Sequence, residues 1–556
     1  MRRLALPLLC ALLLAAPFCF ALVGDSDAGW HLALGRLIAQ SGLPHTNALT
    51  WTARDVPWYD TSWLWDWLSY LLVARFGLTG LQALTLVVFA VTLAAAGIAC
   101  AHADREIGAW LVAALALLLV PRLTVRPHVA TWAGVAAVVA LCTVGSGRHW
   151  RWRAACVPLI ALAGNLHSGA PFAAGVLGLF CAQELWRSRK AAEALIAAAG
   201  IFALLANPGG LFNLRSLLWH LLHVRHVVVI QEYDPPTLQT EPLFFVLLPL
   251  ALWLSWRRRR EQPAVLAAVV IFGALGLKAG RMVYEFEIIA APLFAAAVGS
   301  LRSRSRRLPA LSAALAAIAC GASHQILQRY GELQAGAAWD PATLPVRAVE
   351  FARPMIRGRL FNAYSHGGYL EWALPEVPAL VDGRVQCFPP EFFKRFYAAS
   401  HSPAGFQAWL RELDAEWAMV YRRLPWLSGR DLLAPPDWAL VYWDDVSEVW
   451  LRRDVPRYAP LIAGLEYRRF RPHAQVLQLL AAGGRAEATE WLAEIDRYSQ
   501  TTDGDPAALV ARCAALSRLG SPLAPEACAR AELLIPPALR PALQAARAVK
   551  PGPEKK

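Results

Sequence analysis

Long runs of apolar residues, separated by short polar segments, fill the first three fifths of the chain. The first run, residues 4–23, follows the charged pair Arg2 and Arg3 and has about the ~20 residues that a bilayer-spanning helix requires. Signal peptides also start this way, but no convincing small-residue cleavage site follows, so we expect an uncleaved first helix. Ten further runs bring the expected count to about eleven transmembrane helices: 78–102, 109–120, 129–144, 154–163, 169–185, 191–206, 243–256, 264–277, 288–300 and 308–325.

The pattern changes after residue 325, where apolar runs shorten and turn residues appear. Short mixed stretches at 361–364, 379–382 and 439–443 predict strands of a small α/β module. From residue 460 onward the apolar positions follow a helical period, as in Trp491, Leu492 and Ile495, and suggest helical hairpins similar to a degenerate tetratricopeptide array. We therefore expect a transmembrane domain (1–325), an exterior mixed α/β domain (326–457), a helical hairpin region (458–548) and a disordered tail (549–556).

Composition supports this division. The 556 residues are 57% hydrophobic and 17% charged, with a mean hydropathy of +0.37. Soluble proteins average about 45–50% apolar and about 25% charged residues. These values exclude a single soluble globule and indicate a polytopic α-helical membrane protein.

The net charge is +13, and the basic residues stand in short clusters between the apolar runs. This placement indicates membrane topology rather than nucleic-acid binding. Threading the apolar runs alternately from a cytoplasmic N-terminus places every arginine cluster on the cytoplasmic side, which is the positive-inside pattern. It places the segment after residue 329 outside, together with the loops at 24–66, 121–128, 164–168, 207–242 and 278–287. The clusters are Arg2 and Arg3; Arg148, Arg151 and Arg153; Arg187, Arg189 and Lys190; residues 257–260; and Arg302, Arg304, Arg306 and Arg307.

Seven of the ten cysteines lie in or beside the apolar runs, where cysteine behaves as a small apolar residue. Cys513 and Cys528 are candidates for a disulfide between two helices in an oxidising exterior compartment, and Cys387 would then stay unpaired.

The first exterior loop carries the first candidate chemistry. Asp27 is a good N-cap for a helix that ends before Gly42, and in that helix Asp27, Trp30 and His31 share one face. With Asp25 just before it, this group has the residues for a general base, for a divalent-ion site, or for both. The simpler alternative is that Asp27 only caps the helix and Asp25 is solvated.

The later exterior loops repeat ionisable residues on the same side of the membrane. Such groups are costly at membrane depth and usually line a pathway or a site. Arginine holds a phosphate through paired hydrogen bonds, and a carboxylate removes a proton from an incoming hydroxyl. The candidates are Arg122, Arg126, His128, Asn165, His167, Glu232 and Arg281.

These motifs resemble a bacterial family of GT-C type integral membrane glycosyltransferases, which use polyprenyl-phosphate-linked sugars at the outer face of the plasma membrane. The resemblance covers most of residues 20–455, although Tyr233 stands where related sequences tend to have Trp. The motifs that carry it are Asp25-Ser26-Asp27-Ala28-Gly29-Trp30-His31, Arg126-Pro127, Asn165-Leu166-His167, Asn207-Pro208, Gln231-Glu232-Tyr233, Arg281 with Ala291-Pro292, and Val381-Asp382-Gly383-Arg384.

The resemblance implies that Asp25 or Asp27 acts as base or metal ligand and that arginines and histidines of the later loops surround the lipid phosphate. The spacing adds His31 to the catalytic candidates. It implies a bacterial inner-membrane location with a periplasmic C-terminal part and transfer of a hexose or pentose from a polyprenyl-phosphate donor. The acceptor class stays open between glycan, lipid and protein, and Mg²⁺ or Mn²⁺ is a candidate cofactor.

Two alternatives to an enzyme are a transporter or flippase of lipid-linked intermediates and a non-catalytic scaffold that presents its C-terminal region. A transporter is expected to show internal repeats and charges near mid-membrane. A scaffold has no need for ionisable residues gathered on one face. The expected partners are the lipid donor, the acceptor and membrane lipids, with no nucleic acid.

Overall fold

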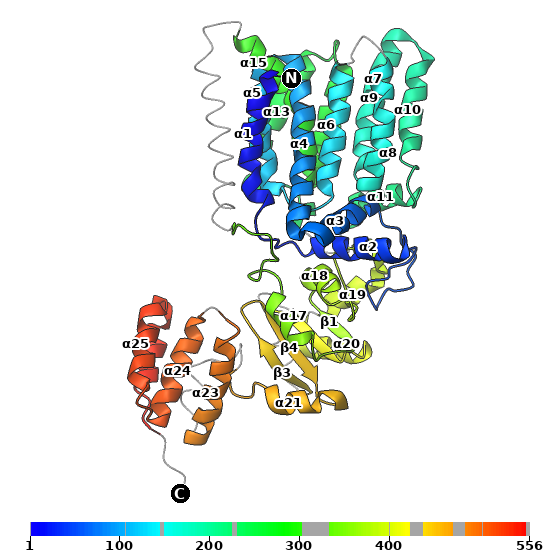
Figure 1. The fold of residues 1–556 in the computed structure, drawn as a ribbon. Helices are drawn as coiled ribbons and strands as arrows, with labels where there is room; N and C mark the ends of the chain where they lie inside the picture. The colour runs from blue at the N-terminus through cyan, green and yellow to red at the C-terminus, as the bar shows by residue number, and fades with distance from the viewer. Residues whose placement is uncertain are drawn as a thin grey trace. The chain divides into compact units, whose positions relative to one another are not determined.

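The structure is a computed structural model that describes residues 2–105, 107–144, 150–224, 231–302, 333–399, 401–422, 437–470, 484–502 and 504–551. The chain forms two compact units (Figure 1). The first contains residues 1–49, 53–339 and 384–393, and the second contains residues 50–52, 340–383 and 394–556.

The first unit is helical. Its longer helices lie side by side as a bundle, and two helices, α2 (Asp27–Ser41) and α3 (Trp63–Phe76), lie across one end of it (Figure 1). Gly35 in α2 lets them approach closely, because a Cβ there would be 2.0 Å from the carbonyl oxygen of Asp66. The other helices are α1 (Arg2–Cys19), α4 (Leu78–Ala103), α5 (Ile107–Leu119), α6 (His128–Val144), α7 (Trp150–Ala154), α8 (Cys156–Leu166), α9 (Ala170–Ser188), α10 (Ala191–Ala203), α11 (Phe212–Leu222), α13 (Pro242–Arg257), α14 (Pro263–Lys278) and α15 (Val283–Arg302).

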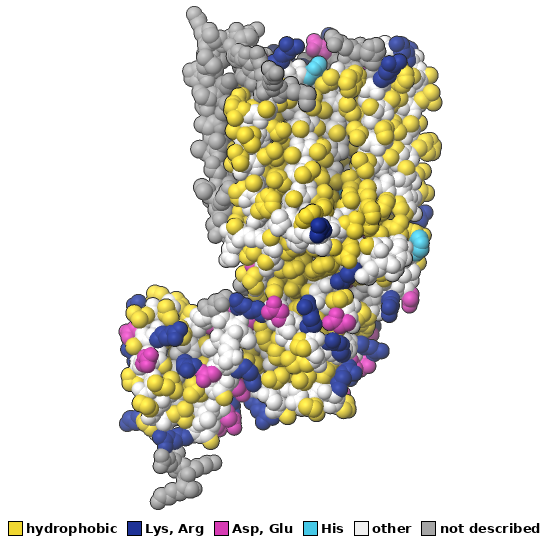
Figure 2. Space-filling view, viewed as in Figure 1, with side chains coloured by type: hydrophobic (Ala, Val, Ile, Leu, Met, Phe, Trp, Pro, Cys, Tyr) yellow, Lys and Arg dark blue, Asp and Glu magenta, His cyan; other side chains and the backbone are white. Residues whose placement is uncertain are grey.

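Each expected apolar run within the described ranges coincides with a helix, and the run at 308–325 lies outside them. Among the described residues, two helices, Leu78–Ala103 and Gly280–Ser300, are long and apolar enough to cross a membrane. The other apolar helices are shorter, so the expected count of about eleven crossings is not confirmed. On the face shown in Figure 2, a broad belt of hydrophobic side chains covers the bundle, and Lys and Arg side chains lie at the end that holds the N-terminus.

The second unit contains a four-stranded sheet in the order β1-β2-β4-β3. Strand β1 (Leu360–Asn362) is parallel to β2 (Trp417–Tyr421), whereas β4 (Ser447–Arg452) is antiparallel to both β2 and β3 (Trp438–Trp443). Nearly every strand residue is buried, so helices and loops cover both faces. Around the sheet lie α17 (Val346–Ala352), α18 (Gly367–Ala373), α20 (Pro403–Glu412) and α21 (Ala459–Leu465), and α19 (Pro390–Ala399) begins in the segment that belongs to the first unit.

The strand predictions are partly wrong. Residues 379–382 do not form a strand, although Ala379 makes an isolated parallel bridge to Thr50. Strands β2 and β4 were not expected. β2 is continuously apolar and lacks the alternation that marks a half-buried strand, and β4 has an apolar run of only three residues, Val449–Leu451.

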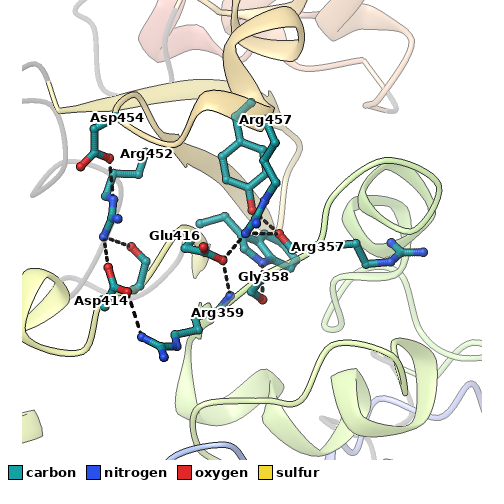
Figure 3. Close-up of polar contacts among 11 residues, drawn as sticks. Arg357, Gly358, Arg359, Asp414, Glu416, Arg452, Asp454 and Arg457 are labelled. Atoms are coloured by element: carbon teal, nitrogen blue, oxygen red, sulfur yellow. Dashed lines mark hydrogen bonds and ion pairs between the residues drawn. The ribbon is translucent and has the colours of Figure 1, made fainter.

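Ion pairs tie together the segments that flank the strands (Figure 3). Asp414 contacts Arg359 at 2.8 Å and Arg452 at 2.9 Å. Glu416 contacts Arg457 and accepts the backbone N–H of Arg359 at 2.8 Å. Exposed pairs contribute only about 0–1 kcal/mol each, so this network fixes strand ends more than it stabilises the unit.

The C-terminal part is helical, with α23 (Arg485–Ser499), α24 (Pro506–Leu519), α25 (Ala524–Leu534) and α26 (Arg540–Arg547). The candidate disulfide, which the sequence left open, is present: Cys513 of α24 is bonded to Cys528 of α25, with their Cα atoms 4.7 Å apart. Cys387 is buried and forms no disulfide with another described cysteine. Residues 552–556 of the expected tail lie outside the described residues.

Candidate functional site

Polar residues from four separate segments of the first unit meet where its helices end. Asp25 and Asp27 stand at the start of α2, and Arg126 stands just before α6. Pro121 and Pro127 explain why the chain leaves α5 and does not resume a helix until residue 128, since proline lacks the N–H that a helix interior needs. The short turn η1 (Val120–Arg122) carries Arg122 in this gap.

Two further short turns complete the set. Glu232 lies in η2 (Gln231–Tyr233), and Arg281 lies in η3 (Gly280–Met282), directly before α15. A backbone hydrogen bond from Gly280 to the carbonyl of Asp234, 2.9 Å long, holds the two turns together. The site therefore rests on irregular backbone between helices, where side chains can converge without interrupting a helix.

The two first-loop acids contact the same arginine. Arg126 binds Asp25 through a pair of contacts, Nη2 to Oδ1 at 2.7 Å and Nε to Oδ2, and its Nη1 lies 3.0 Å from Asp27 Oδ2. Asp25 also accepts the backbone N–H of Asp27 at 3.0 Å. The expectation that Asp27 is the N-cap is therefore wrong by one residue: Asp27 is the first helical residue, Ser26 is the N-cap, and the Asp25 carboxylate binds a free N–H of the helix start.

Glu232 is shared by three arginines. Its Oε1 lies 3.0 Å from Arg281 Nη1, and its Oε2 contacts Arg122 and lies 3.9 Å from Arg126 Nη1. Arg281 Nη1 also donates to the hydroxyl of Tyr233 at 2.6 Å, with its guanidinium 4.8 Å from the centre of that ring. We call Asp25, Asp27, Glu232, Arg122, Arg126 and Arg281 the acid–arginine cluster.

The acid–arginine cluster balances three carboxylates against three guanidiniums in a half-buried setting. The acids are 14–25% exposed and the arginines 21–31% exposed. Burial, followed by the charges of Arg126 and Arg281, lowers the pKa of Arg122 to about 10, so Arg122 stays charged at neutral pH. Because the three arginines repel one another, a bound anion in addition to the three carboxylates would stabilise the arginines further.

Two neutral histidines flank the cluster. Backbone N–H of Gly169 donates to His167 Nδ1 at 3.3 Å, and the Thr131 hydroxyl lies 2.6 Å from the same nitrogen. An acceptor role at Nδ1 places the proton of His167 on Nε2. Burial, followed by the charge of Arg281, lowers the pKa of His167 to about 3. His220 stacks on Tyr233 with ring centres 6.1 Å apart, and burial lowers its pKa to about 4. Both imidazoles are thus hydrogen-bonding groups rather than cations.

His31 belongs to a different, more deeply buried group. Its Nδ1 lies 2.6 Å from Asp66 Oδ1, and these two side chains are 5% and 0% exposed. Arg384 is buried with its guanidinium 5.8 Å from the ring centre of Trp30 and 5.1 Å from that of Trp58. Burial lowers the pKa of His31 well below its usual value and raises that of Asp66 well above. The ring of His31 is thus held by Asp66 and not by Asp27, although the charge of Arg126, the arginine that binds Asp27, also acts on it.

The remaining expected site residues hold local backbone. His128 Nε2 lies 3.2 Å from the carbonyl oxygen of Arg122. Asn165 accepts from Trp63 Nε1 at 2.7 Å and donates to the carbonyls of Ala161 and Ala206 at 2.8 and 2.7 Å. The sequence did not single out His220, Thr131 or Asp66. Their signal in the sequence is weak, since each stands in no recognisable motif.

The carboxylates of the cluster do not fit a divalent ion as they are arranged. Carboxylate oxygens are the ligands that Mg²⁺ and Mn²⁺ prefer, yet the guanidinium of Arg126 contacts Asp25 and Asp27 and lies 3.9 Å from Glu232. Within the described part of the chain, no group of three or more His, Cys, Asp or Glu side chains is placed to hold a metal. An internal cation thus already occupies the position between the acids.

Comparison with known proteins identifies the fold. No family model matches the chain, and no curated protein matches it. A solved structure of the oligosaccharyltransferase AglB from Archaeoglobus fulgidus, in complex with an inhibitory peptide and a dolichol-phosphate, is similar with a TM-score of 0.52 and 10% identity, over 74% of this chain and 69% of that one. A second A. fulgidus oligosaccharyltransferase structure, a complex with Zn and sulfate, has a TM-score of 0.52 and 11% identity over 97% and 84%. The chain therefore has the GT-C fold of these oligosaccharyltransferases.

Proposed function

We propose that this protein is a membrane glycosyltransferase that transfers a sugar from a polyprenyl-phosphate donor to an acceptor at the outer face of a bacterial plasma membrane. The observation that carries the proposal is the acid–arginine cluster, in which four segments that span residues 25–281 of the sequence meet at one end of the helix bundle. The fold shared with oligosaccharyltransferases supports it, as does the dolichol-phosphate in one of those structures.

The transfer requires an acceptor oxygen to attack the anomeric carbon while the bond from that carbon to the phosphate oxygen breaks. Asp27 is the better placed base, because it is 25% exposed whereas Asp25 is 14% exposed and is held at both oxygens by Arg126. The acceptor's proton passes to the Asp27 carboxylate. Arg126 and the Asp25 carboxylate hold Asp27 at the start of α2.

Arg122 and Arg281 suit the departing lipid phosphate. In the free protein both contact Glu232, which therefore occupies an anion position. A donor phosphate would compete with that carboxylate for the same N–H groups and accept charge-assisted hydrogen bonds from both arginines. His167, which carries its proton on Nε2 and lies close enough for the charge of Arg281 to act on it, supplies a neutral donor. No step is assigned to a metal ion, since the carboxylates are directed at Arg126.

The proposed topology follows from the arginine clusters, with the N-terminus in the cytoplasm and the acid–arginine cluster and residues after 333 outside. A transporter is less well supported, because the described charges of this cluster gather at helix ends. Cysteine labelling tests the topology: Arg189→Cys and Arg258→Cys should react only from the cytoplasm, and Asp55→Cys only from outside. The reverse pattern would remove the outer-face assignment.

Mass spectrometry of lipid-linked sugars and surface glycans, with and without the protein, tests the activity. Loss of the protein should deplete one glycan and accumulate one polyprenyl-phosphate sugar. A second test uses Arg281→Lys, which keeps the charge but loses the planar fork of donors. It should raise the KM for the lipid donor more than the KM for the acceptor. Arg215→Lys, which changes an exposed arginine of α11, should change neither KM. An unchanged lipid and glycan profile without the protein would contradict the proposal.

A further inference from the structure

A cavity of about 380 Å³ lies inside the first unit at the end opposite the acid–arginine cluster. Its lining residues on α9 run from Val176 to Gln183, and those on α15 run from Ile289 to Ala296. Seven residues of helix rise about 10 Å, so the cavity extends from the helix ends well into the bundle. Its volume is within the range of about 300–1,000 Å³ that small-molecule sites have.

The cavity is apolar in depth and basic at its mouth. Phe180, Ala268 and Leu293 line the inner part. Near the helix ends, the lining is polar and basic: Arg258, which follows α13, and His102, near the end of α4, stand there with Thr143, Gln183 and Gln262. No Asp or Glu is among the described residues that line the cavity.

Arg258 differs from its neighbours in the same turn. Arg257 lies over the ring of Trp253, with its Cζ 5.1 Å from the ring centre, and Arg259 lies 4.4 Å from that of Trp256. The backbone of Arg258 is hydrogen-bonded to Ser255, Glu261 and Gln262, but its side chain makes no hydrogen bond, ion pair or ring contact with any described residue. A half-buried guanidinium at the mouth of an apolar cavity, with no acid beside it, is therefore available to an anion.

We propose that this cavity binds one acyl chain of an anionic phospholipid from the cytoplasmic leaflet, with the lipid phosphate at Arg258. The size supports a single chain, because the volume is too small for a whole two-chain lipid. The Arg258 guanidinium matches the phosphate through charge-assisted hydrogen bonds, and the apolar depth matches the hydrocarbon chain. This site is independent of sugar transfer and rests only on the membrane location proposed above.

Native mass spectrometry of the full chain, stripped of lipid in detergent, tests the proposal with dioleoyl phosphatidylglycerol, dioleoyl phosphatidylcholine and glycerol 3-phosphate as probes. The wild type should retain one phosphatidylglycerol at least about tenfold more tightly than phosphatidylcholine, as expected for a hydrogen bond to a charged group. Glycerol 3-phosphate should not displace the lipid. Displacement would overturn the chain-binding part of the proposal.

Variants test separately the basic mouth of the cavity and its apolar depth. Arg258→Gln should lose the preference for phosphatidylglycerol, whereas Arg260→Gln, an exposed arginine of the same turn, should keep it. Ala296→Phe fills part of the cavity from α15 and should abolish binding of both phosphatidylglycerol and phosphatidylcholine. If Ala296→Phe does not fold, Val265→Phe, which fills the cavity from α14, tests the same loss of binding. Equal effects of the two arginine variants, or lipid retention by a folded cavity-filling variant, would overturn the proposal.

Discussion

Glu232→Gln tests whether Glu232 holds the place of the donor phosphate. The amide has the same shape as the carboxylate but no charge, and it leaves three arginines facing the two carboxylates of Asp25 and Asp27. The variant should lose stability and at the same time bind a lipid phosphate more tightly. A purely structural ion pair would give only the first effect.

The magnitudes follow from the contacts. Two charges about 4 Å apart attract by about 4 kcal/mol at an effective dielectric constant near 20, and desolvation offsets most of this. Removing one partner of a buried pair costs about 3–5 kcal/mol. Because Arg122 and Arg281 are 31% and 21% exposed, we expect a loss of about 1–3 kcal/mol. Removing the competitor should tighten phosphate binding by about tenfold, the equivalent of one charge-assisted hydrogen bond.

Two assays on the same detergent-solubilised protein measure these quantities. SDS titration in mixed micelles gives the free energy of unfolding, and calorimetric titration with a short-chain polyprenyl phosphate gives the affinity. Glu261→Gln is the control, since Glu261 is exposed in the loop before α14. Weaker phosphate binding by Glu232→Gln would refute the idea of competition, and unchanged values in both assays would refute the contacts themselves.

Three further predictions concern the rest of the structure. Burial lowers the pKa of His366 to about 3. Below about pH 6.5 the unfolded chain therefore takes up a proton that the folded unit does not, and the free energy of unfolding falls as pH falls. Urea titrations of His366→Phe should show this pH dependence reduced by up to about 1.4 kcal/mol per pH unit. Gly35→Ala should force α2 from α3 and destabilise the bundle in SDS titrations, whereas Gly175→Ala, with open space at its Cβ, should not. Cys513→Ser should lower the free energy of unfolding of this region by about 3 kcal/mol, because the disulfide closes a loop of 15 residues. Hydrogen exchange in α24 and α25 should become faster, and unchanged exchange would contradict the prediction.

The sequence placed the loops of the acid–arginine cluster on one side because helix alternation and the arginine clusters are local signals. Asp25, Arg126 and Glu232 could therefore be grouped before any contact was known. Their pairing could not be predicted, since it depends on how the backbone turns after residue 119 and at 231–233. The same limit explains the one-residue error at α2. There the Asp25 carboxylate accepts the backbone N–H of Asp27, and Asp27 is the first helical residue and not the N-cap.

His31 makes a contact that pattern reasoning did not predict. Its spacing from Asp27 indicated a shared face and a shared role, but the packing of α2 on α3 directs it to Asp66. Arg384, about 350 residues later in the chain, completes that buried group between Trp30 and Trp58. The first exterior loop and the start of α3 contain many tryptophans, among them Trp51, Trp58 and Trp63. Such a composition fits an interfacial belt equally well, and composition alone does not distinguish a belt from a buried cation site.

Glycan transfer by Asp27→Asn is the measurement that tests the central claim most directly. A positioned base contributes about 10²–10⁴-fold in rate, so we expect a loss of that size in membranes that contain normal amounts of folded protein. Asp55→Asn, in an exposed part of the same loop, should transfer at the wild-type rate. If Asp25→Asn and Asp27→Asn both retain full transfer, the first-loop acids are structural and the proposed mechanism is wrong.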